Sequence, residues 1–178
     1  MKTIWGSCKA VGEDTWELAA PKDTPDGIGS ALAVWGEVPL VGSPVTVEWE
    51  VLERWGGEEE WRGFWLMFPE GDNWVWPAPY IIPKSNGWQR GYSNGPNPED
   101  EIVAETIRYH GCVDFFGTRR RSLALSADGN ALHIGVGGIV TMSIARSQFW
   151  PGMTWLPLLG LYCEASRVRV KVTKLEEG

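Results

Sequence analysis

The chain of 178 residues carries a formal net charge of −7, and 43% of its residues are hydrophobic. This length and apolar content suffice for one core, so we expect a single domain over residues 1–178. The negative charge argues against nucleic acid or an anionic membrane as a partner, because both are bound through Lys and Arg. We find no signal-peptide core and no apolar run long enough to cross a membrane. The sequence is compatible with a cytoplasmic, a virion-associated or an exported mature protein.

The composition favours β-structure throughout. Twelve Trp and 22 Gly are far above ordinary usage, and Gly, Pro, Asn and Asp recur often enough to interrupt most stretches that would otherwise form a helix. In chain order, residues 27–35 are the first predicted strand. Residues 45–53 alternate strictly, with Val45, Val47, Trp49 and Val51 on one face and Thr46, Glu48 and Glu50 on the other.

Residues 60–83 are predicted to hold the next two strands, joined by a turn at Pro69–Asn73. Residues 77–97, rich in Pro, Gly, Asn and aromatics, read as a long structured loop. The segment 98–108 fits a helix or a strand, and its alternation favours the strand. A meander follows, with strands at 121–126, 131–136 and 139–144 separated by an Asp-Gly-Asn turn and a Gly-Gly turn. Residues 158–163 and 166–174 are the last two predicted strands; in the second, Val168, Val170 and Val172 face inward.

The order of these pieces resembles a known architecture. A Gly-rich strand, a Val-Thr-Val-Glu-Trp-Glu-Val strand, a hairpin ending in Gly-Asp-Asn-Trp, an Asp-Gly-Asn hairpin, Leu-Gly-Leu-Tyr and a closing Val-x-Val-x-Val strand are similar to the concanavalin A-like lectin/glucanase superfamily. The pattern is closest to laminin-G-like modules and 3-keto-disaccharide hydrolase-like domains. The resemblance implies an all-β jelly-roll sandwich of two curved antiparallel sheets, whose concave face commonly takes carbohydrate.

One stretch offers a catalytic interpretation. Residues 48–53 resemble the Glu-x-Asp-x-x-Glu motif of laminarinase-like glycoside hydrolases, which implies Glu48 as nucleophile and Glu53 as acid/base, with Glu50 in the place of the Asp. Strand parity puts Glu48 and Glu50 on one face and Glu53 on the other, unless a β-bulge intervenes. Alternating Glu residues are equally typical of a solvated strand face.

Other chemistries find little support in the sequence. His110 and His133 are the only histidines and no Gly-x-Ser-x-Gly elbow is present, so we predict no nucleophilic triad. The three cysteines, Cys8, Cys112 and Cys163, lack the spacing of a zinc site and read as buried free thiols. Calcium is an option at Asp72 and Asn73, although their place in a turn also explains them.

The aromatic residues on one predicted strand need a cover. Phe64, Leu66 and Phe68 alternate with Trp61, Trp65 and Met67, so both faces of this strand are apolar and the second face needs a cover. If the even-numbered set is core, we expect Trp65 and Met67 to share an outer face with Glu48 and Glu50, as in a sugar site where rings stack and carboxylates accept hydroxyl hydrogen bonds. Trp74, Trp76, Trp88 and Tyr92 are candidates for its rim. A loop folded back over Trp65 or a protein interface would also provide the cover.

Three functional hypotheses follow. The first is a non-catalytic carbohydrate-binding module, with Trp65, Trp74, Trp76, Trp88, Tyr92, Glu48 and Glu50 on a concave face and a glycan as partner. The second is a structural or interaction protein, such as a virion decoration or surface-assembly subunit, that self-associates or binds another protein through these aromatics. The third is a retaining glycoside hydrolase that uses Glu48, Glu50 or Glu53. No cofactor is predicted, apart from the calcium option.

Overall fold

The computed structural model describes residues 1–22, 29–35, 40–55, 62–67, 80–84, 87–93, 102–108, 120–136, 139–148 and 158–175. Within these ranges the chain forms strands almost throughout, with one 3-10 turn, η1 (Arg146–Gln148). The strands are β1 (Lys2–Trp5), β2 (Ser7–Gly12), β3 (Thr15–Ala19), β4 (Ser30–Val34), β5 (Val45–Arg54), β6 (Arg62–Met67), β7 (Tyr80–Lys84), β8 (Gly87–Ser93), β9 (Ile102–Arg108), β10 (Arg120–Ala127), β11 (Ala131–Val136), β12 (Ile139–Ala145), β13 (Leu158–Glu164) and β14 (Ser166–Lys174).

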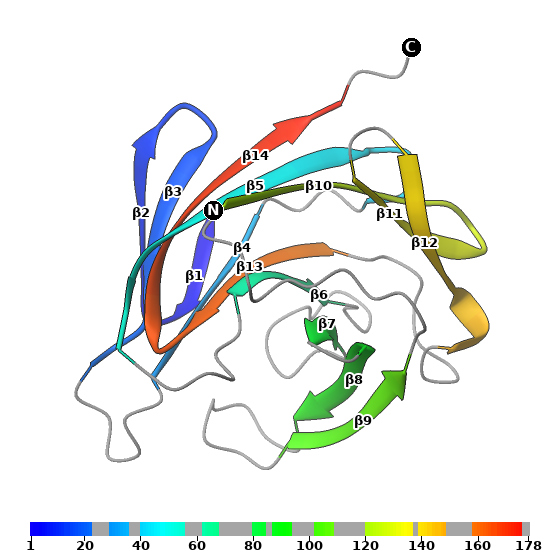
Figure 1. Ribbon diagram of the computed structural model, residues 1–178, viewed down its shortest axis with the longest axis horizontal. Helices are drawn as coiled ribbons and strands as arrows, with labels where there is room; N and C mark the ends of the chain where they lie inside the picture. The colour runs from blue at the N-terminus through cyan, green and yellow to red at the C-terminus, as the bar shows by residue number, and fades with distance from the viewer. Residues whose placement is uncertain are drawn as a thin grey trace.

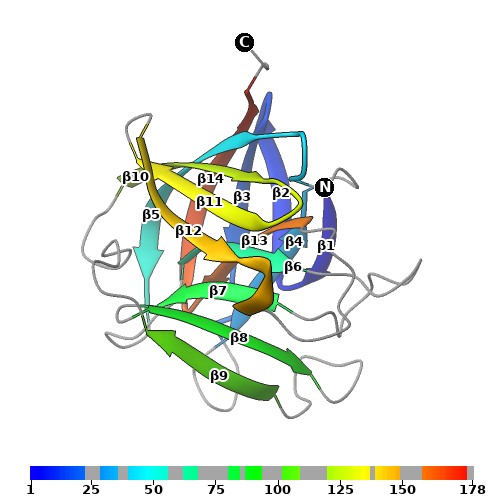
Figure 2. The same cartoon turned by 90° about the vertical axis from the view of Figure 1, so that its right-hand side faces the viewer.

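The strands make two antiparallel sheets of seven strands each. Sheet 1 has the order β1-β4-β13-β6-β7-β8-β9, and sheet 2 has the order β12-β11-β10-β5-β14-β3-β2. Figure 1 shows β14, β5 and β10 of sheet 2 arching over β13 and β4 of sheet 1, so the outer face of sheet 2 lies on the convex side of the arch. Figure 2 shows β10, β11 and β12 at one end of sheet 2, with β7, β8 and β9 below them. This is the jelly-roll sandwich that the sequence predicts.

The core lies between the two sheets and follows from strand alternation. On β5 the burial alternates as predicted, with Val45, Val47 and Trp49 inside. On β14 the odd and even positions separate in the same way: Val170 is buried and Arg169 is exposed. Sheet 1 contributes Ala31 from β4 and Leu159, Leu161 and Cys163 from β13 to the same cluster. A period of two therefore sorts these residues into an apolar interior and a polar surface.

On β4 and β13, sheet 1 is apolar on its second face as well. Leu32, Val34, Leu158 and Tyr162 are buried, and they alternate along β4 and β13 with the residues of the core between the sheets. The register of β6 against β13 pairs Leu66 with Leu159 on the core face. Both faces of β4 and β13 are therefore buried, whereas the predicted cover over the second face of the strand around Trp65 concerns side chains outside those that the structure describes.

The chain passes from one sheet to the other through single residues at two points. Gly6 alone separates β1 of sheet 1 from β2 of sheet 2, and its φ of 69° lies in the left-handed region. Ala165 alone separates β13 from β14 in the same way, with φ 42°. Ala165 is buried, and its amide donates a 2.8 Å hydrogen bond to the carbonyl of Gly29. A left-handed residue turns the strand sharply enough to enter the opposite sheet.

The structure corrects two predictions about elements. Residues 77–97 are not a loop, because β7 and β8 lie within them and pair with each other and with β6 and β9. Pro83 lies in β7 and two glycines lie in β8, and pairing with a neighbouring strand on each side maintains both strands against these local propensities. The first three strands, β1 to β3, were not predicted at all. By contrast, the strand alternative for residues 98–108 is confirmed by β9.

Candidate functional site

The outer face of sheet 2 carries three carboxylates along β5. Glu48 and Glu50 face outward by simple alternation, opposite Lys171 and Arg169 of β14. Glu53 lies opposite Arg167, although Val51 is already opposite Val168. Leu52 is thus an extra residue in β5, and this bulge restores Glu53 to the outer face. The β-bulge on which a Glu48–Glu53 motif depends is therefore present.

Glu50, Arg169 and Glu17 form one row of charges across this face, and ion pairs connect them. The guanidinium of Arg169 donates to the Glu17 carboxylate from Nη2 at 2.7 Å and from Nε at 3.2 Å. Its Nη1 atom also lies 3.9 Å from the Glu50 carboxylate. The side chains of Glu17 and Glu50 are only 19% and 15% exposed. Hydrogen bonding to Glu17 is the first cause that raises the pKa of Arg169, so this row stays charged and paired.

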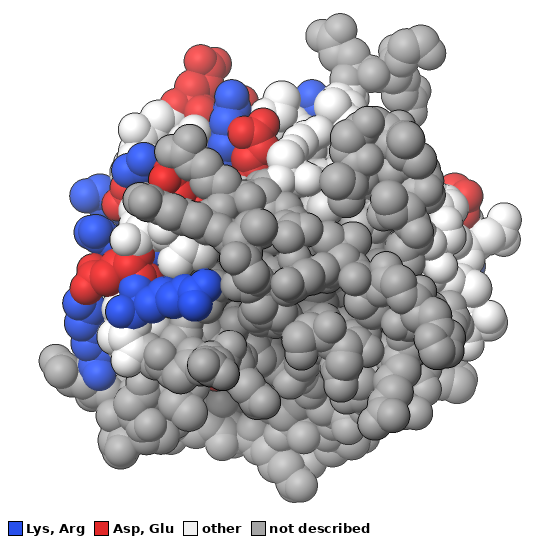
Figure 3. Space-filling view, viewed as in Figure 1, with Lys and Arg blue, Asp and Glu red and all other residues white. Residues whose placement is uncertain are grey.

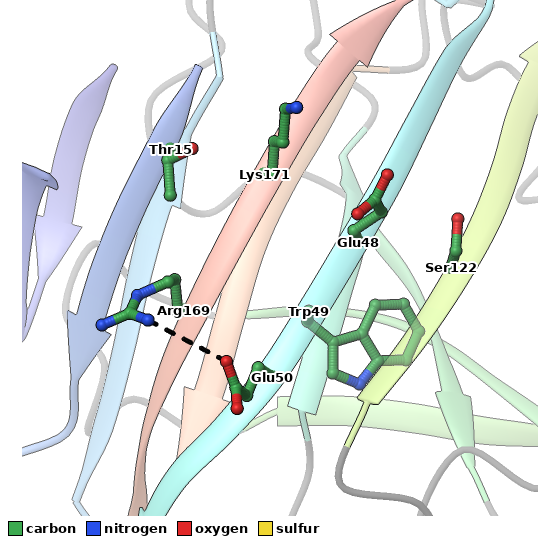
Figure 4. A pocket seen from close by; sticks show the side chains of 7 residues that line it. All are labelled: Thr15, Glu48, Trp49, Glu50, Ser122, Arg169 and Lys171. Atoms are coloured by element: carbon green, nitrogen blue, oxygen red, sulfur yellow. Dashed lines mark ion pairs between the residues drawn. The ribbon is translucent and has the colours of Figure 1, made fainter. Parts of the chain in front are cut away.

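The next row is different, because its charges are uncommitted. Ser122, Glu48, Lys171 and Thr15 follow one another across β10, β5, β14 and β3. Within the described ranges neither Glu48 nor Lys171 forms an ion pair, and the Thr15 hydroxyl donates to the carbonyl of Glu13 at 3.0 Å. Figure 4 shows the four side chains side by side. With neighbouring strands about 4.8 Å apart, the row spans roughly 14 Å.

These residues line a hollow of about 490 Å³, together with Glu50, Arg169 and the strand around Trp49. Its formal charge is zero, since Glu48 and Glu50 contribute −2 and Arg169 and Lys171 contribute +2. In the space-filling view, acidic and basic side chains gather on the left flank, over β2, β3, β14 and β5 (Figure 3). The hollow therefore offers donors and acceptors, positive and negative, with no net formal charge.

Glu53 lies outside this hollow and is held by cations. Lys22 forms an ion pair and hydrogen bond with its carboxylate, and Arg167 lies 3.9 Å away. The hydrogen bond from Lys22 is the main cause that lowers the pKa of Glu53. The ammonium of Lys22 also lies 4.7 Å from the centre of the Trp55 ring, which places it between a carboxylate and an aromatic face. Glu53 is thus kept ionised, the reverse of what a general acid requires.

The predicted meeting of tryptophans with these carboxylates is not formed. Trp65 lies in β6 of sheet 1, whereas Glu48 and Glu50 lie on the convex outer face of sheet 2, beyond the core. The expectation was wrong because it assumed that β5 and β6, consecutive along the chain, are neighbours in one sheet, whereas the chain passes from sheet 2 to sheet 1 between them. Met67 is likewise in sheet 1.

The other predicted aromatic residues also lie in sheet 1. Trp65 is opposite Gly160 of β13 in register, and Trp88 and Tyr92 of β8 are opposite Ile107 and Val103 of β9. Trp74 and Trp76 lie outside the described residues.

A second polar constellation lies at the far end of the same outer face, on the β10–β12 meander. His133 of β11 contacts Ser143 of β12 through Nδ1 at 2.8 Å, and it contacts Asp128, at the turn after β10, through Nε2 at 3.0 Å. From the sequence we predicted no such triad. Counting from the Gly137–Gly138 turn would set Met142 opposite His133, and a register shift between Ile134 and Gly135 brings Ser143 there instead, so the sequence pattern does not indicate this pairing.

No metal-binding group of three or more His, Cys, Asp or Glu side chains occurs in the ranges that the structure describes. The calcium candidates Asp72 and Asn73, and also His110 and Cys112, lie outside those ranges. Cys8 and Cys163 are free thiols, and burial raises the pKa of Cys163 to about 12. Among the described residues, no helix has the length and apolar character needed to span a membrane.

Comparison with known proteins supports the fold of this chain but does not assign it to a family. No protein-family model matches the chain. Short stretches match the methionine–tRNA ligases of Thermococcus onnurineus, with 39% identity over 64 residues, and Thermococcus kodakarensis, with 41% identity over 59 residues. These stretches cover 35% and 33% of this chain and 8% of each ligase. The chain thus spans less than a tenth of the curated relatives that it matches.

Two solved structures are similar over nearly the whole chain. One is a glycoside hydrolase family 16 protein of the Bacteroides ovatus mixed-linkage glucan locus in complex with its product, with a TM-score of 0.51 and 12% identity, covering 94% of this chain and 84% of that one. The other is a family 16 endo-glucanase from the same organism, with a TM-score of 0.51 and 11% identity, covering 95% and 84%. The chain therefore has the concanavalin A-like jelly-roll fold that its sequence resembles.

Proposed function

We propose that this protein binds a neutral glycan, and that the hollow on sheet 2 makes the polar contacts. The observation that carries the proposal is the row Ser122, Glu48, Lys171 and Thr15, in which neither charged side chain forms an ion pair within the described ranges. A carboxylate accepts hydrogen bonds from sugar hydroxyls, an ammonium and the Ser122 hydroxyl donate to sugar oxygens, and the Thr15 oxygen can accept. Zero net charge favours a neutral polyhydroxylated ligand over an anionic polymer. The similar folds of two glucan-degrading enzymes, one of them with its product bound, support this ligand class.

Isothermal titration with mixed-linkage glucan oligosaccharides, preceded by a glycan array, tests the proposal. Each hydrogen bond to a charged group contributes about 1.5–3 kcal/mol, so Glu48→Gln or Lys171→Met should weaken binding by about tenfold or more. Glu53→Gln is the matched control, because Glu53 is a carboxylate of the same strand and face that is paired with Lys22 outside the hollow. We expect it to bind like the unaltered protein.

The tryptophans are a separate part of the proposal. Trp65, Trp88 and Tyr92 lie in sheet 1 and, with Trp74 and Trp76, are proposed as stacking platforms of an alternative glycan site on that sheet, apart from the hollow on sheet 2. If Trp65→Ala abolishes binding while Glu48→Gln does not, the polar site on sheet 2 is wrong and the glycan lies on sheet 1. If no glycan on the array binds at all, the function itself is refuted.

A retaining glycoside hydrolase is the second candidate, favoured by the bulge that brings Glu48, Glu50 and Glu53 to one face. Against it, Glu53 has a lowered pKa and cationic partners, and Glu50 contacts Arg169. We therefore propose a non-catalytic site, and expect no release of reducing ends from β-glucan. Release that disappears in Glu48→Gln would establish the hydrolase instead. An assembly subunit is tested by light scattering, where a stable monomer contradicts it.

A further inference from the structure

Ser143, His133 and Asp128 are linked in series on the outer face of the β10–β12 meander. The Ser143 hydroxyl lies 2.8 Å from Nδ1 of His133, and Nε2 of the same ring lies 3.0 Å from Oδ2 of Asp128. The second carboxylate oxygen, Oδ1, accepts the amides of Asn130 at 2.6 Å and Ala131 at 2.9 Å. The carboxylate is therefore fixed by the turn, the ring by the carboxylate, and the hydroxyl by the ring.

The hydrogen-bonding pattern sets where the protons lie. Hydrogen bonds from His133, Asn130 and Ala131, in that order, lower the pKa of Asp128 to about 2, so its carboxylate only accepts at neutral pH. Nε2 of His133 must then carry the hydrogen that faces Asp128. In the neutral ring this leaves Nδ1 as an acceptor, and the Ser143 hydroxyl donates to it. A lone pair aimed at a serine hydroxyl is the arrangement of a general base with its nucleophile.

The geometry meets the tests for an activated serine. The nucleophile and base are within hydrogen-bonding reach, and a third group orients the base. The ring uses Nδ1 for the serine and Nε2 for the carboxylate, whereas serine proteases use them the other way round. Either ring nitrogen can serve as the base, because the nitrogen that contacts the carboxylate carries the hydrogen and the other keeps its lone pair.

The surroundings leave room for a substrate. His133 is 26% exposed and Asp128 is 57% exposed as side chains, and Ser143 is on the surface. β12 is the last strand of sheet 2 among those described, so one edge of its backbone is turned away from β11. Amides along such an edge can donate to a carbonyl oxygen as it becomes negatively charged. The glycan-binding hollow shares this face, since Ser122 and Ser126 lie four residues, or roughly 13 Å, apart along β10.

We propose that Ser143, His133 and Asp128 form an acyl-transfer site that hydrolyses carboxylic esters with a small acyl group. Oγ of Ser143 attacks the ester carbonyl carbon while its proton passes to Nδ1 of His133. The bond from the carbonyl carbon to the alcohol oxygen breaks, and His133 returns the proton to that oxygen. Water then attacks the acyl-serine and loses a proton to His133, which restores the Ser143 hydroxyl and releases the carboxylic acid. Asp128 positions the ring and stabilises its charged form throughout. This activity does not depend on glycan binding.

The same contacts could instead serve only to fix the turn between β10 and β11, and covalent labelling separates the two roles. The purified protein is treated with a fluorophosphonate probe, and the modified residue is located by peptide mass spectrometry. We expect modification of Ser143 at a rate that falls at least tenfold in His133→Gln. Asp128→Asn should have a similar effect, because the amide keeps the turn acceptor but supplies a donor toward Nε2 and so reverses the tautomer. The corresponding change costs about 10⁴ in serine proteases.

Ser126→Ala is the matched control. Ser126 is opposite His133 in register on the neighbouring strand, on the same face as Ser143, and is not bonded to the ring in the structure. Hydrolysis of 4-nitrophenyl acetate gives a second readout: Ser143→Ala should lose most of the rate, and Ser126→Ala should keep it. Absence of a label on Ser143, or a label that forms equally fast in His133→Gln, overturns the proposal. So does a Ser143→Ala variant that retains the full rate, since free imidazole chemistry would then explain the hydrolysis.

Discussion

Replacing Gly6 with alanine should destabilise the sandwich, and the loss has two parts: a conformational cost and a packing cost. Gly6 has φ 69°, and holding an alanine there costs about 1–2 kcal/mol. The added Cβ would also lie 2.5 Å from Cβ of Ala31 and 2.8 Å from the carbonyl oxygen of Ser30. Overpacking of this kind costs roughly 1–3 kcal/mol, so we expect a total loss of about 2–5 kcal/mol.

Comparing Gly6→Ala with Gly42→Ala separates the packing contribution from the conformational one. Gly42 has nearly the same φ, 68°, but no atom lies within 4 Å of the position that an added Cβ would take. Its loss should be the conformational part alone, about 1–2 kcal/mol. Urea unfolding followed by Trp fluorescence measures both variants. With a slope of about 2 kcal/mol/M, a packing difference of roughly 2 kcal/mol separates their midpoints by about 1 M. Equal midpoints for Gly6→Ala and Gly42→Ala would refute the close packing at the first crossover.

Three further predictions concern the core, acid and thiol chemistry. Leu161→Ala should cost about 2–5 kcal/mol in urea unfolding, since Leu161 is fully buried between the sheets; a loss below about 1 kcal/mol would contradict that placement. Asp128 has its pKa lowered to about 2, below the ordinary value of 3.8, so its contribution to stability is complete above about pH 4 and is lost as the pH falls through about 2. The difference in urea midpoint between the unaltered protein and Asp128→Asn should therefore vanish near pH 2. Cys163, buried and with a pKa raised to about 12, should react with Ellman's reagent at about pH 8 only after unfolding.

The strands that sequence predicts best are those whose alternation is complete. Along β5 and β14 each valine is buried and each charged neighbour faces water, so periodicity alone fixes both the strand and its orientation. The Asp-Gly-Asn turn fixes the β10–β11 hairpin by the same local logic. In β1 to β3 the apolar positions are too few to show a period, and in β7 Pro83 conceals a strand that pairing with two neighbours maintains.

The candidate sites were harder to predict, because they depend on which strands become neighbours. Glu48 meets Lys171 from a strand more than a hundred residues away, and nothing local to either residue indicates this pairing. Trp65 was placed beside Glu48 because their strands are consecutive, yet they belong to opposite sheets. The contact between His133 and Ser143 depends on the register of the β11–β12 hairpin. A register shift between Ile134 and Gly135 changes that register by one residue, so counting from the turn does not predict the pair.

The last two strands occupy the middle of both sheets, which has a consequence for how the protein is made. β13 separates β4 from β6 in sheet 1, and β14 separates β5 from β3 in sheet 2. Until both have left the ribosome, each sheet exists only as two fragments with exposed edges and an uncovered apolar face. The strands that precede β13 and β14 therefore need protection from aggregation until these two have emerged, and removal of β14 should leave two half-sheets instead of a smaller folded protein.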